Sequence, residues 1–190
     1  MSEQQPKKKG AKLIKIFIGL VLLIALAVGG AFVYGNTLKP DWEFKRSTDI
    51  SRWNIAVYDV LADVPAYPSW SSQIKEIKDY KKNADGTATW TAVFTQMGEL
   101  KMHLTESKKH SMLKIEVVEN PMFKGYWLYE MQEVGKEDNH VTRVTLTEHA
   151  TPSNPMIRVM FQFMGGQVDG VLDTALADLK KKAESAKPGT

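Results

Sequence analysis

The chain opens with one long apolar run and continues as shorter segments in which apolar and polar residues alternate. Residues 16–34 (IFIGLVLLIALAVGGAFVY) contain no charged side chain. At 1.5 Å per residue, this run would form about 28 Å of helix, which is close to the hydrocarbon thickness of a bilayer. The pattern therefore predicts a transmembrane helix over residues 16–35.

Two other interpretations of this run stay open. Ala25-Leu26-Ala27 has the small residues of a signal-peptide cleavage site, although the apolar run continues past it. The run could also be a buried helix of a soluble core. All the lysines near the N-terminus precede it, so the positive-inside rule places residues 1–15 in the cytoplasm as a basic tip. Residues 36–190 are then extracytoplasmic, and periplasmic if the protein is bacterial.

A short helix that is broken by prolines is predicted at residues 51–70. Its apolar residues recur at the spacing of one buried helical stripe, and Ser51 stands where an N-cap would stand. Pro65 ends the helix, because the residue before a proline is pushed out of the helical region. Residues 66–70 have room for one more turn, which Trp70 would close as an apolar plug. The pattern predicts two short helices in a V.

From residue 73 to residue 148 the apolar residues follow the two-residue alternation of β-strands. Strands are predicted over residues 74–80, 87–95, 99–105, 112–118, 125–134 and 141–149. Trp42 and Phe44, which alternate with polar neighbours after a connector, indicate a further strand near the start of this region. The strand at residues 125–134 is aromatic on both faces, so its inward face stays open. Six or seven antiparallel strands are expected.

The chain closes with one long predicted helix. Asn154 is a candidate cap, and Pro155 suits the first helical position. A helix over residues 155–183 would be about 43 Å long, enough to lie across the mouth of a curved sheet. Gly165 and Gly166 each cost it about 1 kcal/mol relative to alanine, which indicates close packing or a bend. Its first half (MIRVMFQFM) is apolar nearly all round, so a ligand, the membrane surface or a partner should cover it.

This order of elements resembles the helix-grip fold, and two motifs resemble the START-like (SRPBCC) superfamily. The first motif is a helix with an Asp followed by the pattern YPxW, here Asp63, Tyr67, Pro68 and Trp70, preceded by Val57 and Leu61. The second, VTRVTLTEHATPSNPMIR at residues 141–158, resembles the last strand and closing-helix entry of the polyketide cyclase/dehydrase and lipid-transport branch. The resemblance covers residues 41–183. It implies an α+β helix-grip domain with a deep apolar cavity between sheet and helix, and it implies no particular reaction.

Composition and motifs exclude several classes of function. The chain has no cysteine, which excludes disulfides, CxxC redox pairs and thiolate metal sites. Five of the 25 basic residues and one of the 22 acidic residues fall in the first 35 positions, which leaves 20 basic against 21 acidic residues. The main domain therefore has no basic excess for binding nucleic acid. No nucleophile elbow, P-loop, dinucleotide fingerprint or HExxH occurs, so we expect no cofactor and no metal site.

Three polar residues are weak candidates for catalysis. Glu148 shares the face of Val144 and Leu146, and if that face points inward, an apolar cavity would raise the pKa of its carboxyl and suit it to acid–base work. Glu130 is a second candidate on a neighbouring strand. His149 is a third, because it stands at a strand end near the expected cavity mouth. The other three histidines are expected on the surface.

The apolar faces of the strands and of the closing helix supply the expected ligand-binding residues. Methionine side chains adapt to ligands of varied shape, which makes the methionines on these faces the most suggestive feature. We expect a membrane-anchored module that binds or transfers a lipid or another hydrophobic small molecule. A cyclase- or dehydratase-type enzyme is one alternative, and a ligand-free scaffold for a membrane-protein partner is another. The expected lining residues are Trp90, Phe94, Met102, Leu104, Ile115, Leu146, Met160 and Met164.

Overall fold

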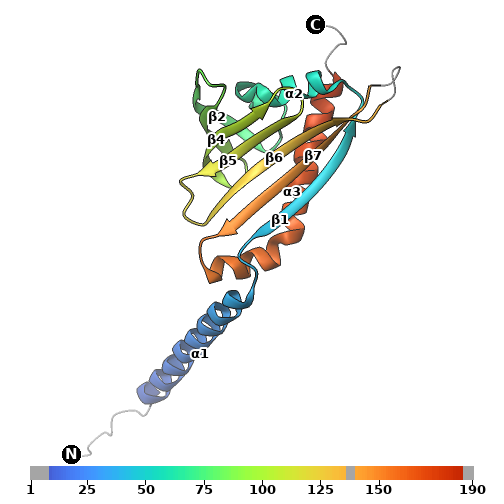
Figure 1. Ribbon diagram of the computed structural model, residues 1–190. Helices are drawn as coiled ribbons and strands as arrows, with labels where there is room; N and C mark the ends of the chain where they lie inside the picture. The colour runs from blue at the N-terminus through green and yellow to red at the C-terminus, as the bar shows by residue number, and fades with distance from the viewer. Residues whose placement is uncertain (1–8, 136–139, 186–190) are drawn as a thin grey trace, which may run out of the picture.

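A computed structural model describes residues 9–135 and 140–185, in which one long helix stands apart from a mixed helix-and-sheet domain (Figure 1). This helix, α1 (Lys9–Thr37), contains an apolar segment of 25 residues, Leu13–Thr37, in which an 18-residue window has a mean hydropathy of 2.8. Every described side chain from Leu13 to Val28 is exposed. The helix is therefore long and apolar enough to span a membrane, and it is not a buried core helix of the domain beside it.

The domain is built on one antiparallel sheet of seven strands, the upper of the two expected numbers. The strands lie in the order β1-β7-β6-β5-β4-β3-β2, so the first strand of the chain pairs with the last. In β3 and β5 apolar residues occupy every second position, and one face of each of these strands is therefore buried. The strands are β1 (Trp42–Ile50), β2 (Ile74–Lys82), β3 (Ala88–Phe94), β4 (Gly98–Lys108), β5 (Met112–Val118), β6 (Phe123–Glu133) and β7 (Thr142–Pro152).

The antiparallel register fixes which loops share an end of the sheet. Strands β1, β2, β4 and β6 begin at the same end, where β3, β5 and β7 finish. Helix α1 leads directly into β1, so we call this end the anchor end. The turn between β3 and β4 and the loop between β7 and the last helix both lie there.

The broken helix predicted before the sheet is present as α2 (Asn54–Ala62) followed by the 3-10 helix η1 (Val64–Ser69). The hydroxyl of Tyr67 donates a 2.6 Å hydrogen bond to the Leu61 carbonyl, which holds η1 against α2. The prediction that Ser51 caps α2 is wrong, because Trp53 stands at the N-cap without a side-chain bond. The backbone N–H of Ser51 instead donates to Glu184 near the end of the last helix, at 2.9 Å.

The last helix, α3 (Pro155–Ser185), begins as predicted, with Asn154 Oδ1 accepting a 3.1 Å hydrogen bond from the Ile157 N–H. Figure 1 shows that its first turns run across the anchor end of the sheet next to α1, and that the rest climbs along the sheet. We call residues 155–164 the first half of α3 and residues 165–185 its second half. The second half carries the four buried residues of the helix, Leu172, Leu176, Leu179 and Ala183.

The two halves of α3 are held by different kinds of contact. Apart from the Asn154 cap, the ion pairs and side-chain hydrogen bonds between α3 and the rest of the domain involve only the second half among the described residues. Asp169 pairs with Arg46 of β1, and Asp178 accepts two 2.7 Å hydrogen bonds from Ser72. The first half has apolar contacts, in which the ring of Phe161 lies against those of Trp42 and Phe123.

Candidate ligand-binding site

A narrow apolar cavity lies between the inner face of the sheet, η1 and the second half of α3. Five of the residues expected to bind a ligand line it: Trp90, Phe94, Met102, Ile115 and Leu146. They come from four strands, β3, β4, β5 and β7, because the two-residue alternation directs one face of each strand toward α3. Strand β6 adds Trp127 and Tyr129, which settles the face that the sequence left open.

The cavity is in the expected place but is much smaller than the sequence led us to expect. The empty space between its walls totals about 710 Å³ when the part open to solvent is included, but the centres of water molecules can occupy only about 60 Å³ of it. A single water needs about 10–15 Å³ on this measure, and an engineered apolar cavity that takes up benzene measures about 150 Å³. A lipid would therefore enter only after α3 or the strand turns move apart.

The cavity opens to the surface at the anchor end of the sheet. A wider, more polar hollow of about 330 Å³ shares Gln73, Phe94, Met97 and Val171 with it. This hollow lies between the β3–β4 turn and the start of the second half of α3, and the side chain of Met97 in that turn is 49% exposed. The mouth therefore faces the same end of the domain as α1.

One polar atom of the cavity wall lacks a partner. The Trp70 Nε1–H is buried, and it has no hydrogen-bond acceptor among the described residues. Two other polar groups of the wall are already used, since Tyr67 bonds to Leu61 and Gln73 Nε2 donates a 2.8 Å hydrogen bond to the Val171 carbonyl. An unsatisfied buried donor costs about 1–3 kcal/mol, which an acceptor atom on a bound ligand would recover.

Glu148 lies on the inner face of the sheet, as its shared face with Val144 and Leu146 predicted. Its register partners are Phe44 on β1 and Trp127 on β6, and of these three residues only Trp127 lines the cavity. Burial raises the pKa of the Glu148 carboxyl, and a hydrogen bond from Trp127 offsets this only in part. Burial, with a smaller contribution from Glu148, also raises the pKa of the Tyr129 hydroxyl.

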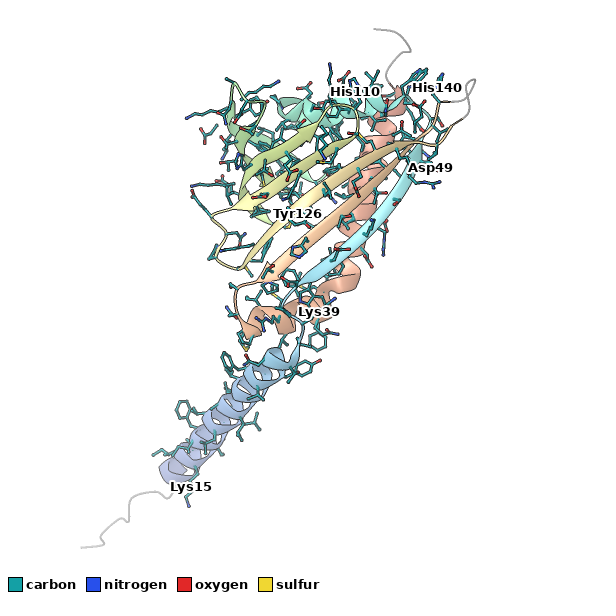
Figure 2. All side chains as sticks on the ribbon, in the orientation of Figure 1. Lys15, Lys39, Asp49, His110, Tyr126 and His140 are labelled. Carbon is teal, nitrogen blue, oxygen red and sulfur yellow. The ribbon has the colours of Figure 1, made fainter. Side chains whose placement is uncertain are left out.

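The two other catalytic candidates lie on the opposite face of the sheet. His149 alternates with Glu148 along β7 and stacks on Tyr126 with 5.0 Å between the ring centroids (Figure 2). Glu130 alternates with Tyr129 and Met131 along β6 and is exposed. The expectation that His149 borders the cavity mouth is therefore not met, because successive residues of a strand point to opposite faces. The structure brings neither residue together with Glu148.

The comparisons with known proteins agree with this architecture. The family model described as polyketide cyclase/dehydrase and lipid transport matches residues 41–184. The chain belongs to this family. No curated protein matches the chain in sequence.

Solved structures of low sequence identity share the fold of this family member. The Zhui aromatase/cyclase from Streptomyces sp. R1128 is 13% identical with a TM-score of 0.61, over 76% of this chain and 94% of that one. A START superfamily protein from Mycobacterium smegmatis is 11% identical with a TM-score of 0.55, over 74% and 98%. Truncated norcoclaurine synthase from Thalictrum flavum is 10% identical with a TM-score of 0.58, over 77% and 96%. These similarities establish a START-like helix-grip fold.

Three residues expected in the binding site do not line the cavity. Met160 and Met164 belong to the first half of α3, which lies across the anchor end instead of over the cavity, and the Met164 side chain is 36% exposed. Leu104 is buried in the core beyond the cavity wall. The sequence showed that these positions are apolar, but not where α3 changes direction.

The cavity also uses residues that we did not predict as ligand contacts. Val171, Ala175 and Leu179 line it from the second half of α3. These three recur four residues apart, which is the spacing of one helical face, so the signal was present in the sequence. Trp70, predicted only as a structural plug, lines the cavity as well.

Proposed function

We propose that this protein is a membrane-anchored module that binds a lipid or another hydrophobic small molecule between the sheet and α3. The observation that carries the proposal is the apolar cavity whose wall contains the unpaired Trp70 Nε1–H. The family description, which includes lipid transport, and the fold shared with an aromatase/cyclase and a START protein support it. A scaffold that needs no ligand would have no use for such a cavity.

The walls indicate the chemistry of the ligand. Side chains that include two tryptophans, Trp90 and Trp127, provide apolar contact, and the Trp70 Nε1–H is a buried donor without an acceptor among the described residues. A ligand with a long or polycyclic apolar body and one carbonyl, carboxylate or hydroxyl oxygen would satisfy both features. Because the space is narrow in this ligand-free state, binding is coupled to a displacement of α3 or of the β3–β4 turn.

The anchor places this site beside a membrane. In our proposal residues 16–35 span the bilayer, residues 1–15 form a cytoplasmic tip, and residues 36–190 form the exported binding domain. The length of the apolar segment of α1 and the lysines that precede it support this arrangement. The cavity mouth lies at the anchor end, so a ligand that leaves the bilayer has a short path to it.

One observation favours a second function, an acid–base reaction of the cyclase or dehydratase type. Glu148 is a buried carboxyl whose pKa burial raises above its usual value, and a raised pKa brings a carboxyl closer to the range in which general acids and bases work. Its neighbour Trp127 lines the cavity but Glu148 does not, and Glu130 and His149 are on the other face. A reaction would therefore depend on Glu148 alone, and Glu148→Gln would remove turnover while leaving ligand binding intact.

Replacing either of two alanines on α3 by phenylalanine tests the binding proposal. Ala175 lines the cavity, whereas Ala177, two residues later, is exposed. The full-length chain in phospholipid nanodiscs is titrated with a fluorescent fatty acid, and co-purifying molecules are identified by native mass spectrometry after extraction. We expect Ala175→Phe to weaken binding by at least about tenfold, which corresponds to 1.4 kcal/mol, because the new ring fills the cavity.

Ala177→Phe is the matched control and should bind like the wild type. Circular dichroism of both variants verifies that they fold. If a folded Ala175→Phe variant binds the fatty acid as tightly as Ala177→Phe does, the cavity is not the binding site. If neither the wild type nor the control binds the fatty acid or carries an extractable ligand, the binding proposal fails.

A further inference from the structure

The first half of α3 exposes apolar side chains where a water-facing helix would carry charges. The side chains of Phe163, Met156 and Met164 are 77%, 38% and 36% exposed. Arg158 is the only charged residue between positions 155 and 164. In the second half the exposed positions include Asp173, Ala177 and Lys181, the mixed surface of an ordinary helix. The exposed apolar patch is therefore confined to the half of α3 at the anchor end.

This apolar patch begins at the point where α3 touches the membrane-length helix. A side chain at Gly35, near the end of α1, would overlap the carbonyl group of Pro155, the first residue of α3. The two helices are thus in direct backbone contact at these residues. Figure 1 shows the first half of α3 lying across the end of α1.

The residues around this contact mark the level of a membrane surface. Tyr34, at the end of α1, is 45% exposed, and Lys39 lies two residues beyond the helix with its ammonium 4.7 Å from the centre of the Trp42 ring. Figure 2 shows Lys39 just past this end of α1 and Lys15 near the other end. Tyrosine, tryptophan and lysine are enriched at the boundary between hydrocarbon and water, so Gly35 and Pro155 lie at that boundary when α1 spans the bilayer.

We propose that the first half of α3 lies in the membrane interface, with Met156, Phe163 and Met164 inserted among the lipids beside the anchor. This proposal rests on the membrane anchor of the proposed function. An interfacial helix buries its apolar face about 5–10 Å into the boundary between headgroups and acyl chains. Arg158 can extend from this helix toward lipid phosphates, as long cationic side chains do at membrane surfaces.

This placement explains why α3 has two kinds of contact with the domain. Ion pairs and hydrogen bonds hold the second half to the sheet, and lipid covers the apolar side chains that the first half leaves exposed. The second half also forms one side of the cavity mouth, at Val171. A helix that touches lipid with its first turns and borders the mouth near its middle sets the height of the mouth above the membrane.

The depth of a spin label tests this placement. The protein has no native cysteine, so single cysteines can carry a nitroxide in the full-length chain, in nanodiscs of mixed phosphatidylcholine and phosphatidylglycerol. Phe163→Cys is the test position. Leu23→Cys, in the middle of the apolar segment of α1, is the reference for hydrocarbon. Ala177→Cys, exposed on the same helix as Phe163, is the reference for water. All three sites are exposed, so the substitutions remove little packing.

Collisions of each nitroxide with oxygen, which dissolves in hydrocarbon, are compared with collisions with a water-soluble nickel chelate. We expect the label at position 163 to have a severalfold higher ratio of oxygen to nickel accessibility than the label at position 177. Its depth should be about 5–10 Å below the phosphates. The inference is overturned if the label at position 163 has the accessibility ratio of the water reference while the label at position 23 has the high ratio of hydrocarbon. The membrane anchor would then still stand.

Two further outcomes would also overturn the proposal. A label at 163 that is shielded from both oxygen and nickel means that protein, either a partner or a second copy of the chain, covers the patch. A label at 23 that reads as water shows that α1 does not span the bilayer. In that case the membrane anchor of the proposed function falls together with this inference.

Discussion

Replacing both glycines in the middle of α3 by alanine should make the protein more stable. Gly165 and Gly166 occupy interior positions of a helix, where glycine is unfavourable because folding removes more backbone entropy from it than from alanine. Neither has the positive φ that would require glycine. Figure 1 shows that α3 changes direction between its first turns and the part that climbs along the sheet, and glycine pairs are a common site of such bends.

The structure leaves room for the added methyl groups. A Cβ on Gly166 would have no heavy atom within 4 Å, and a Cβ on Gly165 would lie 3.5 Å from Cε1 of Phe44, an ordinary packing distance. The expected gain is therefore the difference in helix propensity, about 1 kcal/mol for each site and about 2 kcal/mol for the double variant. With a urea dependence of about 2 kcal/mol per molar, the unfolding midpoint should rise by about 1 M.

The assay is urea unfolding of the full-length chain in detergent, followed by tryptophan fluorescence. Ala177→Gly is the control, since this exposed position on the same helix should lose about 1 kcal/mol. Hydrogen exchange on the first half of α3 provides a second readout, and its protection should increase with stability. If the double alanine variant is destabilised while Ala177→Gly behaves as expected, the bend needs a backbone shape that alanine cannot adopt. The room that the structure leaves for a Cβ at Gly165 and Gly166 would then not predict the effect of alanine on stability.

Two other predictions concern charge and orientation. The folded-state pKa of Glu148 is raised above its usual 4.5, so folding takes up a proton between these two values, and stability falls as pH rises through that window. Glu148→Gln should therefore gain stability relative to the wild type with increasing pH, and a pH-independent difference in urea unfolding would contradict this. For orientation, a membrane-impermeant maleimide is added to cells in which the membrane that α1 would span is intact and any layer outside it has been permeabilised. Lys181→Cys should react with this reagent, whereas Ser2→Cys should not. The reverse reactivity would place the domain in the cytoplasm.

Much of the fold follows from local pattern, because apolar periodicity reflects which side of an element is buried. The alternation of Leu113, Ile115 and Val117 predicted the bounds of β5 without error. Asn154 and Pro155 predicted the start of α3, since capping is decided by neighbouring residues. The Ser51 cap failed because a contact with Glu184, far away in the chain, determines the backbone there.

The binding site was predictable only where it depends on strand alternation. Trp90, Phe94, Met102, Ile115 and Leu146 line the cavity because each is an inward residue of its strand. Glu148 is likewise buried because it shares the face of Val144 and Leu146. Met160 and Met164 were misplaced because they are apolar at helical spacing, a pattern that a cavity wall and a membrane contact produce alike.

The sequence by itself determined the membrane-length helix, the order of the elements and the inward residues of each strand, since these depend on neighbours within a few positions. The tertiary structure decided how wide the cavity is, that Trp70 Nε1 finds no acceptor among the described residues, and that α3 turns across the anchor end beside Pro155 and Gly35. These features arise where segments far apart in the chain meet. The spacing of residues within one segment carries no information about how closely that segment packs against another.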